Sequence, residues 1–211
     1  MKNERFSRQS FLGATGQANI ERCVVGIAGL GGGGAQYVQQ LAHVGFLHYV
    51  LYDNDVVEDS NLNRMVTATE TDVSAGTPKI EAAKRSILAV RGTAVIDAHK
   101  CRWQDNPEPL RRCDLILGTV DSFAERRELE AFCRRYLIAY IDVGMDLHQV
   151  GDEPPVMSGQ VILSMPGGPC MFCLGFLTEE KLGREAAPYG AAGGRPQVVW
   201  PLVLCYSLIV G

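Results

Sequence analysis

Short apolar runs alternate with amphipathic segments along most of the chain. Runs such as 24–28 and 114–120 have the length of buried strands, whereas 33–45 and 123–135 carry apolar residues at helical spacing. Parallel strands covered on both faces are continuously apolar and are joined by helices. The pattern predicts an α/β fold. The predicted elements are helices at 6–20, 33–45, 78–91 and 123–135, and strands at 24–28, 48–53, 94–99, 114–120, 137–142 and 159–165.

Three segments interrupt this alternation. Only a Gly/Pro-containing stretch at 151–155 separates the last two strands, so we expect an antiparallel C-terminal extension of the sheet. Residues 56–77 lack periodicity and are expected to form a crossover loop. No linker divides the chain, which predicts a single domain over 1–211. The apolar run 198–210 is too short to span a membrane and directly precedes the last residue, which favours a truncated or unusual C-terminus.

The most informative stretch is a glycine-rich turn after the strand at 24–28. Gly29 would let the strand turn, Gly31 would let the backbone approach a phosphate, and Gly34 would let the next helix pack on the strand. The following strand ends in Asp53, whose carboxylate is placed to bind a ribose hydroxyl. These features predict a Rossmann-like, mostly parallel sheet with helices on both faces and a bound nucleotide.

Residues beyond Asp53 indicate which nucleotide binds. Arg64 and Lys79 are pure donors that suit the triphosphate of ATP. Asp121, after the strand at 114–120, suits Mg²⁺, a hard cation that binds carboxylates and phosphates. An NAD-dependent oxidoreductase would leave Arg64 and Lys79 unexplained. We therefore expect ATP and Mg²⁺ as cofactors.

Six motifs follow one another along the chain: Arg5-Phe6-Ser7-Arg8-Gln9, the glycine turn, Asp53-Asn54-Asp55, Ser60-Asn61-Leu62-Asn63-Arg64, Pro78-Lys79 and Val120-Asp121. In this order, over residues 5–175, the chain resembles the ThiF/MoeB/HesA adenylyltransferases, which are related to ubiquitin-activating enzymes. The resemblance implies that the C-terminal glycine carboxylate of a ubiquitin-like or sulfur-carrier protein attacks the α-phosphate of ATP. An acyl-adenylate and pyrophosphate would result, mainly through positioning and charge neutralisation.

The resemblance also implies a role for individual residues. Asp53 would bind ribose, Asp121 would hold Mg²⁺ or orient the phosphates, and Arg8 would act as an arginine finger in the partner subunit of a homodimer. The expected cofactor contacts are Gly29, Gly31, Gly34, Asp53, Asp55, Asn61, Arg64 and Lys79, and the expected catalytic residues are Arg8, Arg64, Lys79 and Asp121.

Structural alternatives stay open for several of these residues. Lys79 could be one more charge on a helix face, and Asp55 could cap a turn. Asp121 could be the N-cap of the helix that follows it. Arg8 could pair with Glu4 or Glu21 in its own chain.

The C-terminal third departs from the family pattern in its cysteines. Cys170 and Cys173 have zinc-ligand spacing, but no second CxxC motif follows and only Cys205 lies beyond them. Zinc binding and a pair of reduced cysteines therefore stay open. The stretch 187–193, where many relatives carry a thioester-forming cysteine, contains none, so we expect the reaction to stop at adenylation unless a partner or a mobile loop supplies the thiol.

Composition restricts the partners and the compartment. A net charge of −4 gives no reason to expect nucleic acid or a membrane surface. Seven scattered cysteines and a polar N-terminus without a signal-peptide core favour the reducing cytoplasm. Two functional alternatives remain: activation of a carboxylate on a modified tRNA or a short peptide, and a catalytically idle scaffold subunit.

Overall fold

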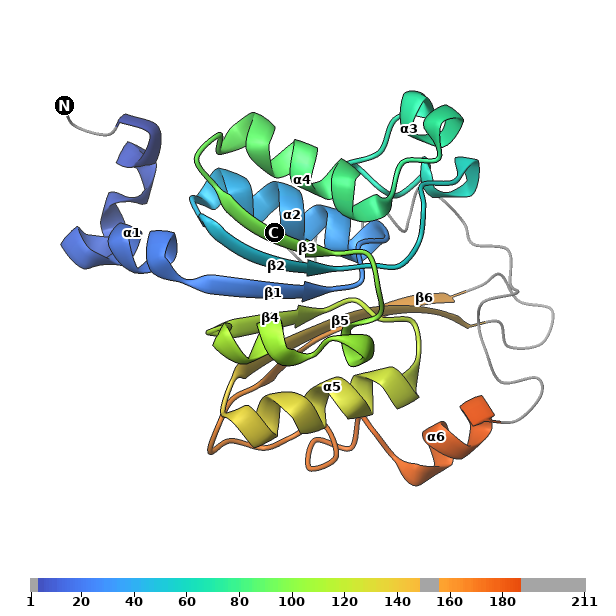
Figure 1. Cartoon of the computed structure of the whole chain (residues 1–211). Helices are drawn as coiled ribbons and strands as arrows, with labels where there is room; N and C mark the ends of the chain where they lie inside the picture. Colours follow the sequence, from blue (N-terminus) through green and yellow to red (C-terminus); the bar gives the residue numbers. More distant parts are fainter. Residues whose placement is uncertain (1–3, 149–155, 187–211) are drawn as a thin grey trace.

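The computed structural model describes residues 4–148 and 156–186, which form one α/β unit around a single sheet (Figure 1). The described strands lie in the order β3-β2-β1-β4-β5-β6. β1 to β5 pair in parallel, and β6 pairs antiparallel with β5, so the predicted fold class is confirmed. The strands are β1 (Val24–Ala28), β2 (His48–Tyr52), β3 (Val95–His99), β4 (Leu115–Gly118), β5 (Ala139–His148) and β6 (Val156–Ser164).

Helices cover both faces of the sheet. α2 and α4 pack together on one face, while α5 covers the other (Figure 1). The α-helices are α1 (Gly13–Arg22), α2 (Gly32–Val44), α3 (Glu70–Ala75), α4 (Lys79–Val90), α5 (Phe123–Tyr136) and α6 (Glu179–Ala186). Short 3₁₀ helices are η1 (Glu4–Leu12), η2 (Asp59–Asn61), η3 (Trp103–Asp105) and η4 (Glu108–Arg112).

Alternating residues of each central strand supply two hydrophobic cores. On β2, Tyr49 and Leu51 pack with α2 and α4, whereas Val50 and Tyr52 pack on the α5 side. Both sets are almost fully buried, which is why these strands are continuously apolar in sequence. The two cores fix the strands against each other, and with them the residues at the strand ends.

The strand order reverses between β1 and β4. The chain runs outward from β1 through β2 to β3, then returns across η3 and η4 to β4, on the other side of β1. In open α/β sheets, ligands bind beyond the carboxyl ends of the strands at this switch point. The ends of β1 and β4 therefore mark the first place to look for a site.

Several predicted boundaries are wrong, each for a local reason. The expected helix at 6–20 is two elements, η1 and α1, because Gly13 at their junction has a φ of +78°. The expected strand at 137–142 begins later, since Leu137 ends α5 in a left-handed conformation with φ of 57°. β5 also runs on to His148 because it pairs along its length with β6.

The predicted crossover loop at 56–77 contains two short helices, η2 and α3. α3 begins with a reciprocal capping pair, in which Thr69 and Asp72 each accept a hydrogen bond from the other's backbone N–H. α6 was not predicted at all. Within the described ranges, none of the helices has the length and apolar character needed to cross a membrane.

Candidate functional site

The glycine turn has the tight geometry that the sequence predicts. Gly29 has a φ of +89°, a conformation that residues with a side chain rarely adopt. A Cβ on Gly34 would collide with the carbonyl oxygen of Gly29, so only glycine lets α2 start this close to β1. By contrast, no heavy atom lies within 4 Å of the position a Cβ would take on Gly31. The N-terminus of α2 is therefore open to an anion at Gly31.

Asp53, directly after β2, is hydrogen-bonded to this turn. One carboxylate oxygen accepts a hydrogen bond from the backbone N–H of Leu30 at 2.7 Å, and the other accepts from Asp55 N–H at 2.9 Å. Burial raises the pKa of Asp53, and the nearby positive charge of Lys79 opposes that shift. Asp53 thus ties β2 to the glycine turn, and its contact with ribose stays a prediction.

Lys79 faces the same region from the start of α4. Its ammonium lies 2.8 Å from a carboxylate oxygen of Asp55, and only 12% of its side chain is exposed. Lys84, on the same helix, is 41% exposed and lies 3.9 Å from Glu81. A cation in the first turn of a helix is disfavoured by the helix dipole unless an anion compensates it. Lys79 is therefore unlike an ordinary charge on a helix face.

The crossover segment holds Asn61 and Arg64 in a folded turn. Asn61 is buried, and its side-chain oxygen accepts from the N–H of Glu58 at 3.1 Å. The Arg64 guanidinium donates to the carbonyl of Ser60 at 2.5 Å and to the side chain of Asn63 at 3.0 Å. Both side chains are thus engaged within their own turn, and their contacts with phosphate stay predictions.

An ion pair to a buried carboxylate fastens this segment to α4. The Arg85 guanidinium donates to both oxygens of Asp72, at 2.7 and 2.6 Å, and to the carbonyl of Thr67 at 3.1 Å. These hydrogen bonds hold the pKa of Asp72 well below its usual range. The crossover segment is therefore anchored on α4, the helix that Lys79 begins.

Asp121 is exposed at the carboxyl end of β4. Its alternative role as helix cap is wrong, because Ser122 caps α5 and accepts from the N–H of Glu125 at 3.0 Å. The Thr119 hydroxyl donates to the carbonyl of Gly29 at 2.8 Å, which brings this segment against the glycine turn. Asp121 thus lies two residues after a threonine that is bound to the glycine turn, and an exposed carboxylate fits Mg²⁺, which binds through one or two carboxylates plus phosphates.

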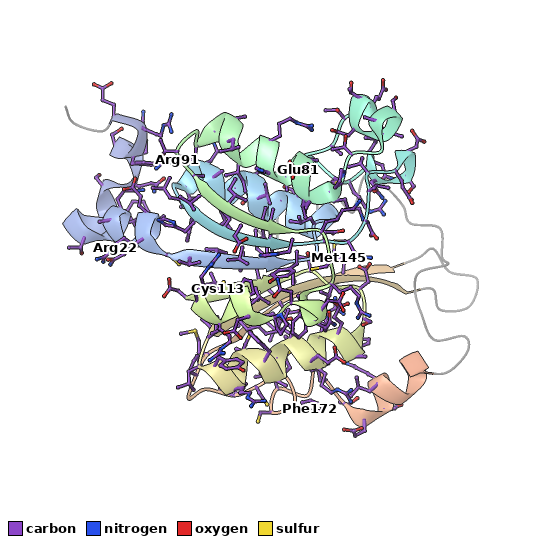
Figure 2. The ribbon with its side chains drawn as sticks, in the orientation of Figure 1. Arg22, Glu81, Arg91, Cys113, Met145 and Phe172 are labelled. Carbon is purple, nitrogen blue, oxygen red and sulfur yellow. The ribbon has the colours of Figure 1, made fainter. Side chains whose placement is uncertain are left out.

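Arg8 lies away from these residues within one chain. η1 and α1 lead into the amino end of β1, whereas the glycine turn follows its carboxyl end (Figure 1). Glu21 pairs with Arg91 at 3.3 Å, and no ion pair joins Arg8 to Glu4 or Glu21 in the described part of the chain. Arg91, labelled in Figure 2 near the amino-terminal helices, also lies over the ring of Phe6. An arginine-finger role for Arg8 would require a second subunit.

Cys170 and Cys173 share one tight turn. Their sulfur atoms are 3.5 Å apart, and a backbone N–H of Cys173 lowers the pKa of the Cys170 thiol. Phe172, between them, lies on the loop below α5 in Figure 2. In the two described ranges, no group of three or more metal-ligating residues surrounds them. The pair supplies half of a tetrahedral set, and Cys205, the stretch 187–193 and the run 198–210 lie outside the described residues.

One polar cluster was missed by the sequence reasoning. Arg126 of α5 forms a buried ion pair with Asp142 of β5, and the Tyr140 hydroxyl donates to the same carboxylate. The only signal in the sequence is an aspartate within an apolar strand. A carboxylate there needs a partner, but the sequence does not say which arginine supplies it.

Comparisons with known proteins show what the chain is similar to. The model of the ThiF family matches residues 5–194. The SAMP-activating enzyme E1 of Haloferax volcanii is 31% identical over an alignment of 176 positions, which covers 81% of this chain and 61% of that protein. The sulfur carrier protein adenylyltransferase of Thermus thermophilus is 29% identical over an alignment of 217 positions, gaps included, which covers 98% of this chain and 77% of that protein.

A solved structure shares the fold. E. coli MccB, crystallised with AMPCPP and selenomethionine MccA, superposes with a TM-score of 0.74 at 22% identity. The match covers all of this chain and 62% of MccB. The chain therefore spans less than two thirds of MccB and of the Haloferax relative, and at this identity the superposition shows the fold alone.

Proposed function

Because the chain belongs to the ThiF family, we propose that it adenylates the C-terminal glycine carboxylate of a ubiquitin-like or sulfur-carrier protein, using ATP and Mg²⁺. One observation carries the proposal: the glycine turn, Asp53, the Asp55–Lys79 pair and Asp121 gather where β1, β2 and β4 end. The names of the Haloferax and Thermus relatives support the same chemistry.

The proposed reaction balances without a nucleophilic side chain. A carboxylate oxygen of the carrier attacks the α-phosphorus, and the bond from that phosphorus to the β-phosphate oxygen breaks. Acyl-adenylate and pyrophosphate leave with no proton transferred, because the attacking carboxylate is already ionised at neutral pH. The protein's task is to position the two reactants and to neutralise charge.

The chain's own residues divide this task. Backbone N–H groups at Gly31 and the start of α2 would bind a phosphate, and Lys79 and Arg64 would neutralise the triphosphate. Asp53 would bind ribose while it keeps the glycine turn in place. Asp121 would hold Mg²⁺, which when bound offsets the negative charge of the phosphates.

The remaining roles extend beyond the described part of one chain. We propose a homodimer in which Arg8 completes the partner's site, since Arg8 lies at the other end of β1 from its own glycine turn.

Cys170 and Cys173 can supply two zinc ligands, and the other two would have to come from elsewhere. The free thiols support a reducing compartment, and we infer the cytoplasm.

ATP–pyrophosphate exchange tests the central proposal. Purified protein, ATP and Mg²⁺ are incubated with radiolabelled pyrophosphate and carrier proteins that end in Gly-Gly, with the same carriers lacking the last glycine as matched controls. We expect label in ATP only with the intact tails. Because 187–193 contains no cysteine, we also expect no thiol-sensitive conjugate between enzyme and carrier.

Other outcomes would identify a different function. ATP binding without exchange for any glycine-ended carrier would contradict the proposal. Pyrophosphate exchange that depends on a short peptide or a modified tRNA would show that the chain activates a carboxylate on that substrate instead of on a carrier protein. Failure to bind ATP, despite a folded protein, would favour an idle scaffold subunit.

A further inference from the structure

A buried ion pair ties α5 to β5, and the proposed reaction does not use it directly. Nε of Arg126 lies 3.2 Å from both carboxylate oxygens of Asp142, and the Tyr140 hydroxyl donates to one of them at 2.9 Å. The Asp142 side chain is fully buried, and that of Arg126 is 10% exposed. A buried pair adds little stability over well-packed apolar residues, so stability alone does not account for it.

The Arg126–Asp142 pair adjoins both ends of the segment that carries Asp121, which runs from the end of β4 to the start of α5. Asp142 is in register with Gly118, the last residue of β4, and Asp121 follows three positions later. Arg126 is in the first turn of α5, and its backbone N–H donates to the carbonyl of Ser122 at 3.0 Å. Asp121 therefore lies between a strand end and a helix start that are both fastened to the same stretch of β5.

Small residues make room for this arrangement. A Cβ on Gly118 would lie 2.5 Å from the hydroxyl of Tyr140, and a Cβ on Gly144 would lie 2.1 Å from the side-chain nitrogen of Gln160 and 2.7 Å from the Arg126 guanidinium. The backbone of β4 and β5 thus approaches the polar cluster at positions where any side chain would displace it. Glycine at positions 118 and 144 thus leaves the space that the side chains of Tyr140 and Arg126 occupy.

The other side of the same segment is fastened to the glycine turn. Thr119 donates its backbone N–H to the carbonyl of Ala28 at 3.0 Å and its hydroxyl to that of Gly29 at 2.8 Å. Residues 119–122 are therefore held from two directions, by β1 at their start and by the Arg126–Asp142 pair at their end.

We propose that Arg126 and Asp142 are positioning residues that fix Asp121 relative to the glycine turn. The chemical meaning of that position rests on the proposed function. Mg²⁺ demands nearly ideal octahedral geometry, so a carboxylate ligand must be placed accurately. A misplacement of about 1 Å costs on the order of 10²-fold in rate.

The same helix offers a matched control. Arg134, eight residues further along α5, donates to Glu130 at 3.1 Å and to the hydroxyl of Ser164 at 2.8 Å. Glu130 is 5% exposed, so this pair is also largely buried. Arg134 lies about 12 Å further along the helix than Arg126, and Glu130 about 6 Å further, so both side chains of the second pair start further from Asp121 than Arg126 does. Loss of either pair weakens the packing of α5, but only the first should move Asp121.

The experiment compares Arg126→Met/Asp142→Asn with Arg134→Met/Glu130→Gln. Each double variant leaves no charge of its pair unpartnered, and the amide oxygen introduced at position 142 can still accept a hydrogen bond from Tyr140. Three quantities are measured: amide hydrogen exchange of peptides covering 118–126, Mn²⁺ binding in the presence of a non-hydrolysable ATP analogue, and the kcat and KM for ATP of pyrophosphate exchange. The first two do not require turnover.

For the Arg126/Asp142 variant we expect hydrogen exchange in 118–126 to accelerate at least about tenfold. Mn²⁺ affinity should fall about tenfold and kcat on the order of 10²-fold, while KM for ATP changes by less than about threefold. The Arg134/Glu130 variant should loosen the end of α5 and leave all three quantities at the wild-type level. If the first double variant does not fold, Arg126→Lys keeps the charge, and the same changes in smaller size are expected.

The inference would be overturned if the folded Arg126/Asp142 or Arg126→Lys variant exchanged the amide hydrogens of 118–126 at the wild-type rate. It would also be overturned if the Arg134/Glu130 control changed the three quantities as much as the Arg126/Asp142 variant does. If the wild-type protein shows no pyrophosphate exchange with any carrier, the proposed function fails. The hydrogen exchange and Mn²⁺ results would then still decide whether the pair positions Asp121.

Discussion

Two lysines on α4 differ in their surroundings, because the side chain of Lys79 is largely buried and that of Lys84 is exposed. Lys79 is the subject of the first prediction. Lys79→Met should weaken ATP binding about 10- to 100-fold, because one charge-assisted contact to phosphate is worth about 1.5–3 kcal/mol. Lys84→Met, on the same helix but paired only with Glu81 at 3.9 Å, should bind ATP like the wild type. Calorimetric titration with a non-hydrolysable analogue measures both. If both variants bound ATP equally well, Lys79 would serve only to neutralise the charge of Asp55 and would not contact the nucleotide.

Asp72 provides a prediction about pH at the same scale. The Arg85 hydrogen bonds lower the pKa of Asp72 below its unfolded value of about 4, so the pair stabilises the fold above pH 4 and loses this effect as the pH falls further. Arg85 is half exposed, so we expect only about 1 kcal/mol at pH 7, or about 2–4 °C in Tm.

Thermal denaturation of Asp72→Asn at pH 7 and at pH 3 measures this effect. The variant should melt below the wild type at pH 7, and the gap should narrow at pH 3. Glu81→Gln, which removes an exposed charge in the first turn of α4 and its 3.9 Å contact with Lys84, is the control and should differ little at either pH. A gap for Asp72→Asn that is independent of pH would show that the carboxylate charge is not what stabilises the crossover segment.

At the level of elements, the turn between β1 and α2 allows folding and binding to be separated. Gly34→Ala should strongly destabilise the protein, because its Cβ would collide with the carbonyl of Gly29. Gly31→Ala should keep nearly the wild-type Tm, since its Cβ would meet nothing within 4 Å, but should weaken ATP binding about tenfold or more by blocking the phosphate. Unchanged ATP affinity of Gly31→Ala would place the phosphate elsewhere.

The same elements show why local patterns predict some features and not others. The unit from β1 to β2, with its glycine turn and Asp53, was predicted from sequence because strand, turn and helix follow one another directly along the chain. α3 was missed because its six residues depend on the Thr69–Asp72 cap rather than on apolar periodicity. The Arg126–Asp142 pair was missed because it depends on how α5 packs on β5, which no local pattern specifies.

For the whole molecule, the decisive question is whether two chains share one site. One chain brings Asp53, Lys79 and Asp121 to the carboxyl end of the sheet and leaves Arg8 at the amino end, so the arginine-finger prediction requires a dimer. Arg8→Ala should then lower adenylation on the order of 10²-fold or more, with ATP affinity and dimerisation nearly unchanged. Asp121→Ala should lower it as well, and should also weaken its dependence on Mg²⁺.

Mixing the two inactive variants tests this arrangement directly. In a dimer of one Arg8→Ala subunit and one Asp121→Ala subunit, one site carries both substitutions and the other carries neither, provided that Arg8 acts across the interface. Random exchange of equal amounts makes half of the dimers mixed, so roughly a quarter of the wild-type activity should return. Pyrophosphate exchange measures the recovery, and mass spectrometry of intact dimers confirms that subunits have exchanged. If mixed dimers form and no activity returns, Arg8 serves its own subunit or only the fold, because each of the two sites would then carry one of the two substitutions and neither would be intact.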